Sequence, residues 1–144
     1  MADNLQLEVI TPHRTVLNKQ VDSISLPGIE GELGILADHI PLLTIMDSGI
    51  LTYTIKEKTQ SIAVHWGYAQ VDGNSVRILA ELAETADEID INRAKEAEKK
   101  AKNKLAPANS KNVELGDEND RFKKYENKLK RSIVRQRLAQ NIYS

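Results

Sequence analysis

An aspartate and an arginine three residues apart are the first side chains whose types and spacing suggest chemistry. They are Asp90 and Arg93, in the stretch "IDINRA" at residues 89–94. A carboxylate just before a helix caps it by accepting hydrogen bonds from the first backbone N–H groups. A cap favours Glu at the third helical position, and acids also suit the positive end of the helix dipole. Arg93 has the opposite sign, so we expect its guanidinium to serve another partner.

A one-sided run of basic residues near the C-terminus is the second candidate. Residues 121–137 carry one acid, Glu126, and eight basic groups: Arg121, Lys123, Lys124, Lys128, Lys130, Arg131, Arg135 and Arg137. Because like charges three or four residues apart repel on a helix, we expect this run to have an acidic partner. Nucleic acid is one such partner, but the chain lacks the interleaved aromatic residues that stack on bases.

Other kinds of site are not supported by residue type and spacing. The sequence has no Cys, which removes disulfides, thiolate nucleophiles and cysteine metal sites. His13, His39 and His65 show no ligand spacing, whereas a metal site needs several convergent ligands. Phosphate-binding and dinucleotide glycine motifs are absent, and no Ser–His–Asp or paired-carboxylate arrangement can be argued. We therefore expect no metal site, no catalytic cofactor and no enzyme activity.

The elements that must position the charged residues fall into two halves, and the first reads as strands. Short runs with apolar alternation are separated by turn residues: "LQLEVI", "VDSISL", "GILTYTIKEK", "TQSIAVHW" and "NSVRILAELA". Asp72–Gly73–Asn74 is typical of a hairpin turn. The glycine-rich stretch with Glu30, Glu32, Asp38 and His39 can be read as turns with polar tips. This pattern predicts an all-β sandwich or barrel.

The second half reads as two helices. From about residue 88, Ala, Lys and Glu dominate, and all are good helix formers. The first helix carries a stripe of small residues and stops at Pro107, while the second, about residues 117–142, carries larger ones. These are Ala94, Ala97, Ala101 and Leu105, then Phe122, Tyr125, Leu129, Ile133, Val134, Leu138 and Ile142. The combination predicts a close antiparallel hairpin, displaceable because neither helix has a wide apolar face.

Charge is divided between the two halves. Residues 1–89 carry five basic and thirteen acidic groups, a net of −8, and residues 90–144 carry fifteen basic and eight acidic groups, a net of +7. This asymmetry predicts that the halves attract each other or that the basic arm binds an acidic partner. No apolar run approaches the roughly 20 residues that cross a bilayer, and no signal-peptide pattern is present. We expect a soluble protein that is not exported.

The stretch "GIEGELGILADHIPLLT" at residues 28–44 resembles the signature of the epsilon subunit of bacterial F-type ATP synthases. The resemblance lies in the Gly-Glu-Leu-Gly-Ile run at 31–35, in His39 and Pro41, and in the apolar pair that follows, with Ala37–Asp38 in place of the usual Pro-Gly. It extends through "LEVITPHRTVL", "IAVHWGYAQVDGNSVRILAE" and "EIDINRA" over essentially the whole chain, with a longer connection between the helices.

The resemblance implies an α+β fold, with a ten-stranded β-sandwich over residues 1–86 and an antiparallel two-helix hairpin over residues 87–144. It implies a non-catalytic subunit at the foot of the rotating central stalk, peripheral to the cytoplasmic face of the bacterial plasma membrane. The implied partners are the gamma subunit, the c-ring and, through the C-terminal helix, the catalytic beta and alpha subunits.

The resemblance also implies individual contacts to these partners. Glu32 and His39 would face the rotor ring and gamma. Lys123, Lys124 and Lys128 belong to the basic run that would reach an acidic loop of the catalytic subunits. Trp66, in an apolar strand, is expected to be a core or interface anchor.

Relatives that bind ATP carry an Ile/Leu-Asp-x-x-Arg-Ala pattern where this chain has residues 89–94. Carried over, Glu84, Ile89 and Asp90 would hold adenine, with Arg93 and Ala94 beside them. The phosphates would be held by Arg131 and Arg135, which share a helix face, and by Lys100, where an arginine is common. ATP would be a regulatory ligand that is not hydrolysed, with Mg²⁺ as an optional companion.

The resemblance thus implies two placements of one hairpin. In the compact placement ATP holds the basic helices against the acidic sandwich, and in the extended one the second helix enters the catalytic head and blocks hydrolysis. Two alternatives remain. One is the same rotor subunit with a nucleotide-insensitive hairpin. The other is a nucleic-acid-binding β-domain with a basic tail, which predicts steeply salt-dependent binding.

Overall fold

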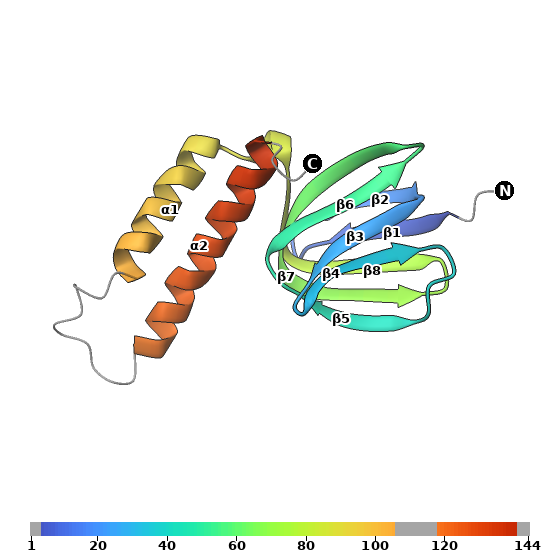
Figure 1. Cartoon of the computed structure of the whole chain (residues 1–144), viewed down its shortest axis with the longest axis horizontal. Coiled ribbons are helices and arrows are strands. Elements are labelled where there is room, and N and C mark those ends of the chain that lie inside the picture. Colours follow the sequence, from blue (N-terminus) through green and yellow to red (C-terminus); the bar gives the residue numbers. More distant parts are fainter. Residues whose placement is uncertain (1–3, 106–117, 141–144) are drawn as a thin grey trace.

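The computed structural model describes residues 4–105 and 118–140. Figure 1 shows a β-sandwich with a pair of antiparallel helices against one end. The strands are β1 (Leu5–Ile10), β2 (Thr15–Val21), β3 (Ser23–Gly28), β4 (Gly31–Leu36), β5 (Leu42–Met46), β6 (Gly49–Ile55), β7 (Lys58–Asp72) and β8 (Ser75–Thr85). A short 3₁₀ turn η1 (Ala86–Glu88) leads to α1 (Ile91–Leu105) and α2 (Glu118–Gln140). Pro107, Ile142 and the connection between the helices lie outside the described residues.

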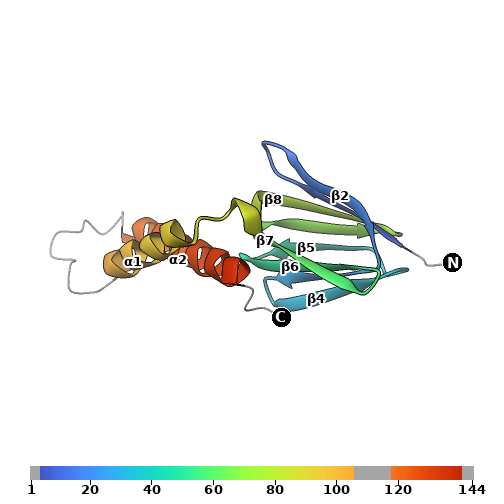
Figure 2. The ribbon, with the colours of Figure 1, turned by 90° about the horizontal axis from the view of Figure 1, so that it is seen from above.

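The sandwich arises because one sheet folds back on itself. The strand order is β2-β1-β8-β7-β5-β3-β4, and β6 joins both β3 and β7. β7 pairs with β6 along its first half and with β5 along its second half. The two layers that result are seen edge-on in Figure 2. The α+β class and the sandwich followed by two helices are therefore confirmed.

The resemblance implies ten strands, whereas the described part of the chain has eight. The number is smaller because β7 and β8 each run through both layers without a break. At the bend of β7, Trp66 and Gly67 have φ values of 50° and 144°. Core-facing positions shift there from even numbers, such as Val64, to odd ones, such as Ala69. Counting the halves of β7 and β8 separately restores ten segments, so the difference concerns continuity and not architecture.

Gly67 is needed at this bend for a steric reason. A Cβ atom at this position would lie 1.9 Å from the backbone oxygen of Leu79 on β8, far inside van der Waals contact. The positive φ also disfavours any residue with a side chain. Glycine thus allows β7 and β8 to stay paired while both pass from one layer to the other.

The main core lies between the two layers. Leu5, Leu7 and Val9 of β1 are fully buried while their neighbours are half-exposed, which confirms the alternation read from "LQLEVI". Full burial of such side chains contributes about 1.5 to 3 kcal/mol each. By contrast, the reading of Glu30, Glu32, Asp38 and His39 as tips of turns is only partly right: Glu30 and Asp38 lie in turns, but Glu32 lies within β4. Its alternation is hidden by glycine, with only Leu33 and Ile35 facing inward.

The helices form a second layer of contacts outside this core. Ala94 and Ala101 of α1 are buried where the small-residue stripe meets α2, as predicted. α2 in turn lies on β6 and β7. A small cluster joins them, with Ala63 of β7 and Val134 and Leu138 of α2 at its centre. The hairpin is therefore compact here, attached by a limited apolar contact. No helix among the described residues combines the length and apolar character that a bilayer span requires.

Candidate anion site between the helices

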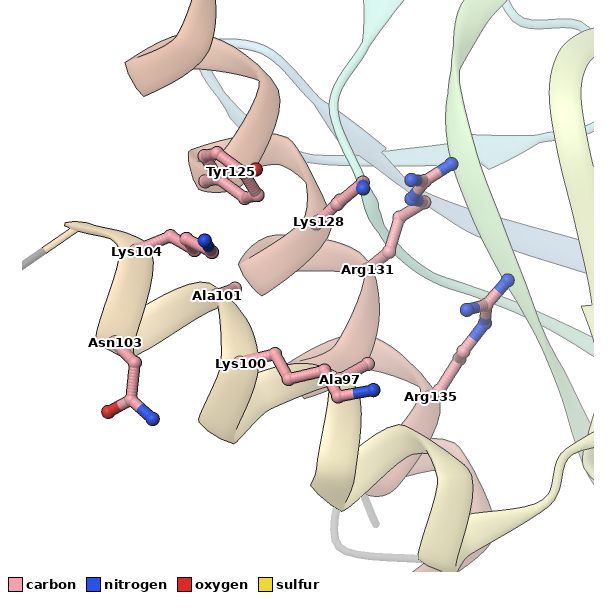
Figure 3. Close-up of a pocket in the computed structure, with 9 residues that line it drawn as sticks. All are labelled: Ala97, Lys100, Ala101, Asn103, Lys104, Tyr125, Lys128, Arg131 and Arg135. Atoms are coloured by element: carbon pink, nitrogen blue, oxygen red, sulfur yellow. The ribbon is translucent and has the colours of Figure 1, made fainter. Parts of the chain in front are cut away.

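A cleft of about 550 Å³ runs between α1 and α2. Figure 3 shows its lining, which is Ala97, Lys100, Ala101, Asn103, Lys104, Tyr125, Lys128, Arg131 and Arg135. Five of these residues are cationic and none is acidic. Such a concentration of one sign of charge in a concave site favours anions, because the ligand relieves the repulsion among the cations.

Three of the predicted phosphate ligands lie in this cleft. Arg131 and Arg135 project from one face of α2, as their spacing predicts, and Lys100 approaches from α1. In Figure 3 the two guanidinium groups extend from α2 toward the sandwich strands. The guanidinium carbon of Arg131 lies 5.8 Å from the ring centre of Trp66. Its Nε atom is buried without a hydrogen-bond partner among the described residues, so it retains donor capacity.

The contact of Trp66 with Arg131 supports the interpretation of this tryptophan as an interface anchor. The indole lies where β7 bends and meets a cation of α2, a geometry that attracts by cation–π interaction. Because Trp66 is the only tryptophan of the chain, its fluorescence reports on this contact between sandwich and hairpin.

Arg135 leads from the cleft into a polar chain within the interface. Its Nε donates to Oε1 of Glu84 at 2.7 Å. The same oxygen lies 3.2 Å from Nε2 of His65, and Nδ1 of His65 lies 2.8 Å from the hydroxyl of Ser48. A carboxylate only accepts hydrogen bonds, so Nε2 of the ring carries the proton toward Glu84 and Nδ1 accepts from Ser48.

The electrostatics of this chain fix the charge of each member. Burial opposes ionisation of Glu84, but hydrogen bonds from His65 and Arg135 outweigh it and hold the pKa of Glu84 below its usual value. Burial is the main reason why the pKa of His65 is lowered; Glu84 opposes this shift, while Arg135 and Arg131 add to it. At neutral pH the interface thus contains an ionised Glu84, a neutral His65 and a cationic Arg135.

The residues predicted to hold adenine do not line the cleft. Oδ1 of Asp90 accepts from the backbone N–H groups of Asn92 and Arg93 at 3.1 and 3.2 Å, which confirms the helix-cap interpretation. Ile89 packs against the cluster between α2 and the sandwich, and Ala94 is buried. Of this predicted group, Glu84 alone contacts a residue of the cleft, Arg135.

Arg93 is exposed at the start of α1. Within residues 4–105 and 118–140 it enters no ion pair. Its side chain is therefore available to an outside partner, as the sequence predicts.

Charge attraction between the halves of the chain is also confirmed. Besides Arg135 and Glu84, Nζ of Lys130 lies 3.9 Å from a carboxylate oxygen of Asp47. Both pairs join the basic α2 to the acidic sandwich. The attraction predicted from net charge is thus localised at this interface.

The predicted partner contacts lie at separate places. Glu32 is exposed near the β3–β4 turn, where it accepts a hydrogen bond from Ser25. His39 lies beyond the opposite end of β4, with its Nδ1 2.8 Å from the carbonyl oxygen of Ile40. Lys123, Lys124 and Lys128 are exposed on α2. Glu32 and His39 therefore do not form one contact surface.

An exposed apolar row was not found by sequence reasoning. Ile45 pairs with Tyr68, Tyr68 with Leu79, and Leu79 with Ile10, so one row crosses β5, β7, β8 and β1 on the outer face. Ile45, Tyr68 and Leu79 are 50%, 54% and 44% exposed. We call these four residues the apolar row. An alternating pattern shows which residues share a face of one strand, but only strand register places them side by side.

Residues 4–86 match the family described as the ATP synthase, Delta/Epsilon chain, beta-sandwich domain. Since this match covers more than half of the chain, the chain belongs to the ATP synthase delta/epsilon family. Curated relatives confirm the resemblance to epsilon subunits. This chain is 40% identical over 139 residues to the ATP synthase epsilon chain of Geotalea uraniireducens, and the match covers 96% of each chain. It is 50% identical over 106 residues to the ATP synthase epsilon chain of Carboxydothermus hydrogenoformans, covering 74% of this chain and 79% of the relative.

Solved structures share the fold. A chain of the Euglena gracilis mitochondrial ATP synthase, from a structure of OSCP, F1 and c-ring, matches 92% of this chain and 79% of its own length, with a TM-score of 0.77 and 21% identity. A chain of the Tetrahymena thermophila mitochondrial ATP synthase, from a structure of the central stalk and c-ring, matches 97% of this chain and 96% of its own length. Its TM-score is 0.55 and its identity is 17%. These likenesses establish the architecture of the sandwich and helices.

Proposed function

We propose that the chain is a non-catalytic subunit of the central stalk of an F-type ATP synthase, where it couples the catalytic head to the ion-driven c-ring. Membership of the delta/epsilon family and relatives named epsilon chain support this role. The chain would lie at the cytoplasmic face of the bacterial plasma membrane, bound to the membrane sector through the rotor. Glu32 and His39, at opposite ends of β4, would contact gamma and the ring at separate places.

The apolar row is the surface that best fits the gamma subunit. A row across four strands that leaves large side chains about half-exposed is typical of a protein interface. Its residues belong to the sandwich and not to the hairpin, although Ile45 and Tyr68 line a pocket together with Lys123, Asn127 and Lys130 of α2. A rotor contact that transmits torque has to be carried by the rigid part of the subunit, which here is the sandwich.

Co-purification with gamma tests this surface. Tyr68→Asp places a charge at the centre of the row and is expected to abolish capture of gamma, because an unpaired charge would be buried on binding. Leu36→Asp is the matched control, since Leu36 is 66% exposed on β4 outside the row. Equal capture of gamma by both variants would remove the row from the proposal.

The hairpin would regulate ATP hydrolysis through the cleft between the helices. Its five cations are the single observation that carries this half of the proposal. The triphosphate of ATP would lie among Lys100, Arg131 and Arg135, with adenine toward Glu84, Ile89 and Asp90. Bound only by the compact hairpin, ATP at 100 times its dissociation constant would favour that state by about 2.7 kcal/mol.

Without ATP, the hairpin would extend toward the catalytic subunits. The contact that holds α2 on the sandwich is small, and the basic residues Lys123, Lys124 and Lys128 are exposed. They would meet acidic groups of the catalytic beta and alpha subunits, and the inserted helix would block rotation in the hydrolytic direction. ATP would then be a signal of energy supply and not a substrate, with or without Mg²⁺.

Calorimetric titration of the full chain with ATP, with and without Mg²⁺, tests the regulatory half. Arg131→Ala and Arg135→Ala are expected to weaken binding about tenfold or more each, the loss of a charge-assisted hydrogen bond of about 1.5 to 3 kcal/mol. Lys95→Ala, an exposed α1 lysine outside the cleft, should bind as the wild type does. Absence of heat from the wild-type protein would favour the nucleotide-insensitive alternative, while the rotor role would stand on the gamma experiment.

A further inference from the structure

The hydrogen-bonded chain of Ser48, His65, Glu84 and Arg135 joins four separate elements of the molecule. Ser48 precedes β6, His65 is on β7, Glu84 is on β8, and Arg135 is on α2. All contacts pass through His65 or Glu84, and Glu84 offers the same oxygen to His65 and Arg135. The charge state of this one ring therefore bears directly on the strongest polar contact between hairpin and sandwich.

The burial of His65 depends on α2. Ile62 and Val64, its neighbours in β7, belong to the main core, whereas Ala63 points away from that core and contacts α2. Since side chains alternate along a strand, His65 lies on the same outer face as Ala63. Yet its side chain is completely inaccessible. Moving α2 away would expose the imidazole to water and remove the guanidinium groups that face it.

We propose that His65 is a proton-sensitive latch for the hairpin, so that acidification releases α2 from the sandwich. Neutral His65 completes the hydrogen-bonded chain and shares the Glu84 carboxylate with Arg135. A protonated ring would compete with Arg135 for Glu84 and would place a third cation beside the partly buried Arg131 and Arg135. The latch acts on hairpin docking itself and does not depend on ATP binding.

The direction of the pH dependence follows from the groups around the imidazole ring of His65. Glu84 from β8 favours the protonated form, while burial and the two arginines of α2 disfavour it, and their balance lowers the pKa of His65 in the compact state. Ser48, from the β5–β6 turn, adds no charge. In the released state the pKa returns toward its ordinary value of 6.5. Protons therefore bind more tightly to the released state, so the compact state loses stability as pH falls below about 6.5.

This linkage gives a measurable slope. Between the pKa of the released state and the lower pKa of the compact state, the ratio of compact to released protein falls by up to tenfold per pH unit. Above about pH 7.5 both states carry a neutral ring, and the ratio no longer changes with pH. The pKa of Glu84 is also lowered, from its ordinary value of 4.5. Glu84 therefore stays ionised above pH 5.5 and does not contribute to a pH dependence measured there.

Single-molecule energy transfer in the full chain, without nucleotide, tests the latch. The chain has no cysteine, so Thr59→Cys on the sandwich and Lys99→Cys on α1 introduce the only two labelling sites. Both residues are exposed. The proportion of compact molecules is measured from pH 8 to pH 5.5, in the labelled parent and in variants of its histidines.

His65→Gln retains an amide that can donate to Glu84 but does not titrate. We expect the compact proportion of this variant to stay constant across the range, while that of the parent falls below about pH 6.5. His39→Gln, which removes a histidine at the far end of β4, should keep the parent's pH dependence. A pH-independent parent, or an equal slope in His65→Gln, overturns the proposal.

A second measurement tests the latch without any substitution, in case the hairpin of the His65→Gln variant does not dock on the sandwich. Nuclear magnetic resonance titration of the unmodified chain follows the imidazole ring of His65. In the compact state His65 is expected to titrate below its ordinary value of 6.5, and its signals should shift together with those of α2. If His65 titrates at or above its ordinary value, or without any change in the signals of α2, the latch is refuted.

Discussion

Leu138→Ala should separate hairpin docking from the stability of the sandwich. Leu138 is 1% exposed and belongs to the small cluster with Ala63 and Val134, while the residues between the layers form a different cluster. Truncating a buried leucine removes its transfer free energy and leaves a cavity, at a typical total of 2 to about 5 kcal/mol. Because this cluster is small and at the edge of the fold, we expect a value near the lower end.

A loss of about 2 to 3 kcal/mol changes the ratio of docked to undocked hairpin by roughly 30- to 150-fold. The sandwich should be unaffected, since its own core keeps every contact. The two effects are measured separately in one preparation. Limited trypsin digestion detects release of α2, which is rich in Lys and Arg, and urea denaturation detects unfolding of the sandwich by circular dichroism.

The expected result is faster cleavage within α2 at an unchanged urea midpoint of the β signal. Phe122→Ala is the matched control, because Phe122 is on the same helix but 56% exposed; it should behave as the wild type. An unchanged cleavage rate would show that the apolar cluster does not hold the hairpin. A fall of both quantities together would show that hairpin and sandwich unfold as one unit, and would refute a displaceable hairpin.

Substitutions at two further positions test the bend of β7 at Gly67 and the helix cap at Asp90. Gly67→Ala would put a Cβ atom 1.9 Å from the backbone oxygen of Leu79, so we expect loss of several kcal/mol, about 3 or more, read as a large fall in thermal midpoint. Gly34→Ala, with no atom within 4 Å of the added Cβ, should be near neutral, and an equal effect of both would contradict the steric argument. Asp90→Ala removes a cap from α1 and should cost about 1 kcal/mol of stability, whereas Asp90→Asn should cost little; chemical denaturation of both variants decides this.

The sequence alone was sufficient where local pattern and chemistry agree. The alternation of "LQLEVI" defines a strand with Leu5, Leu7 and Val9 inward, and period alone determines that result. Asp90 as a helix cap and the small-residue stripe of α1 were likewise readable, because both depend on neighbours within a few positions. The division of charge also predicted that α2 and the sandwich attract.

Strand count and the candidate site show where local reading stops. The apolar run around Val64 and Trp66 hides a shift of the core-facing positions, which depends on how β7 crosses between layers. His65 carried no signal in the sequence beyond its residue type, because its burial comes from a helix some seventy positions away in the chain. The apolar row is equally invisible, since its four members come from four strands.

The amino-acid sequence by itself determined the kind of fold, the helix boundary at Asp90, the division of charge and the family. Each of these depends on residue types and short spacings, which tertiary contacts alter little. Tertiary structure alone decided that five cations meet in one cleft, that Glu84 binds Arg135 and His65 together, and that the residues predicted to hold adenine lie outside that cleft. These arrangements depend on strand register and on packing between segments that are distant in the sequence. A small difference in either changes whether a side chain lies in the site or is exposed elsewhere on the surface.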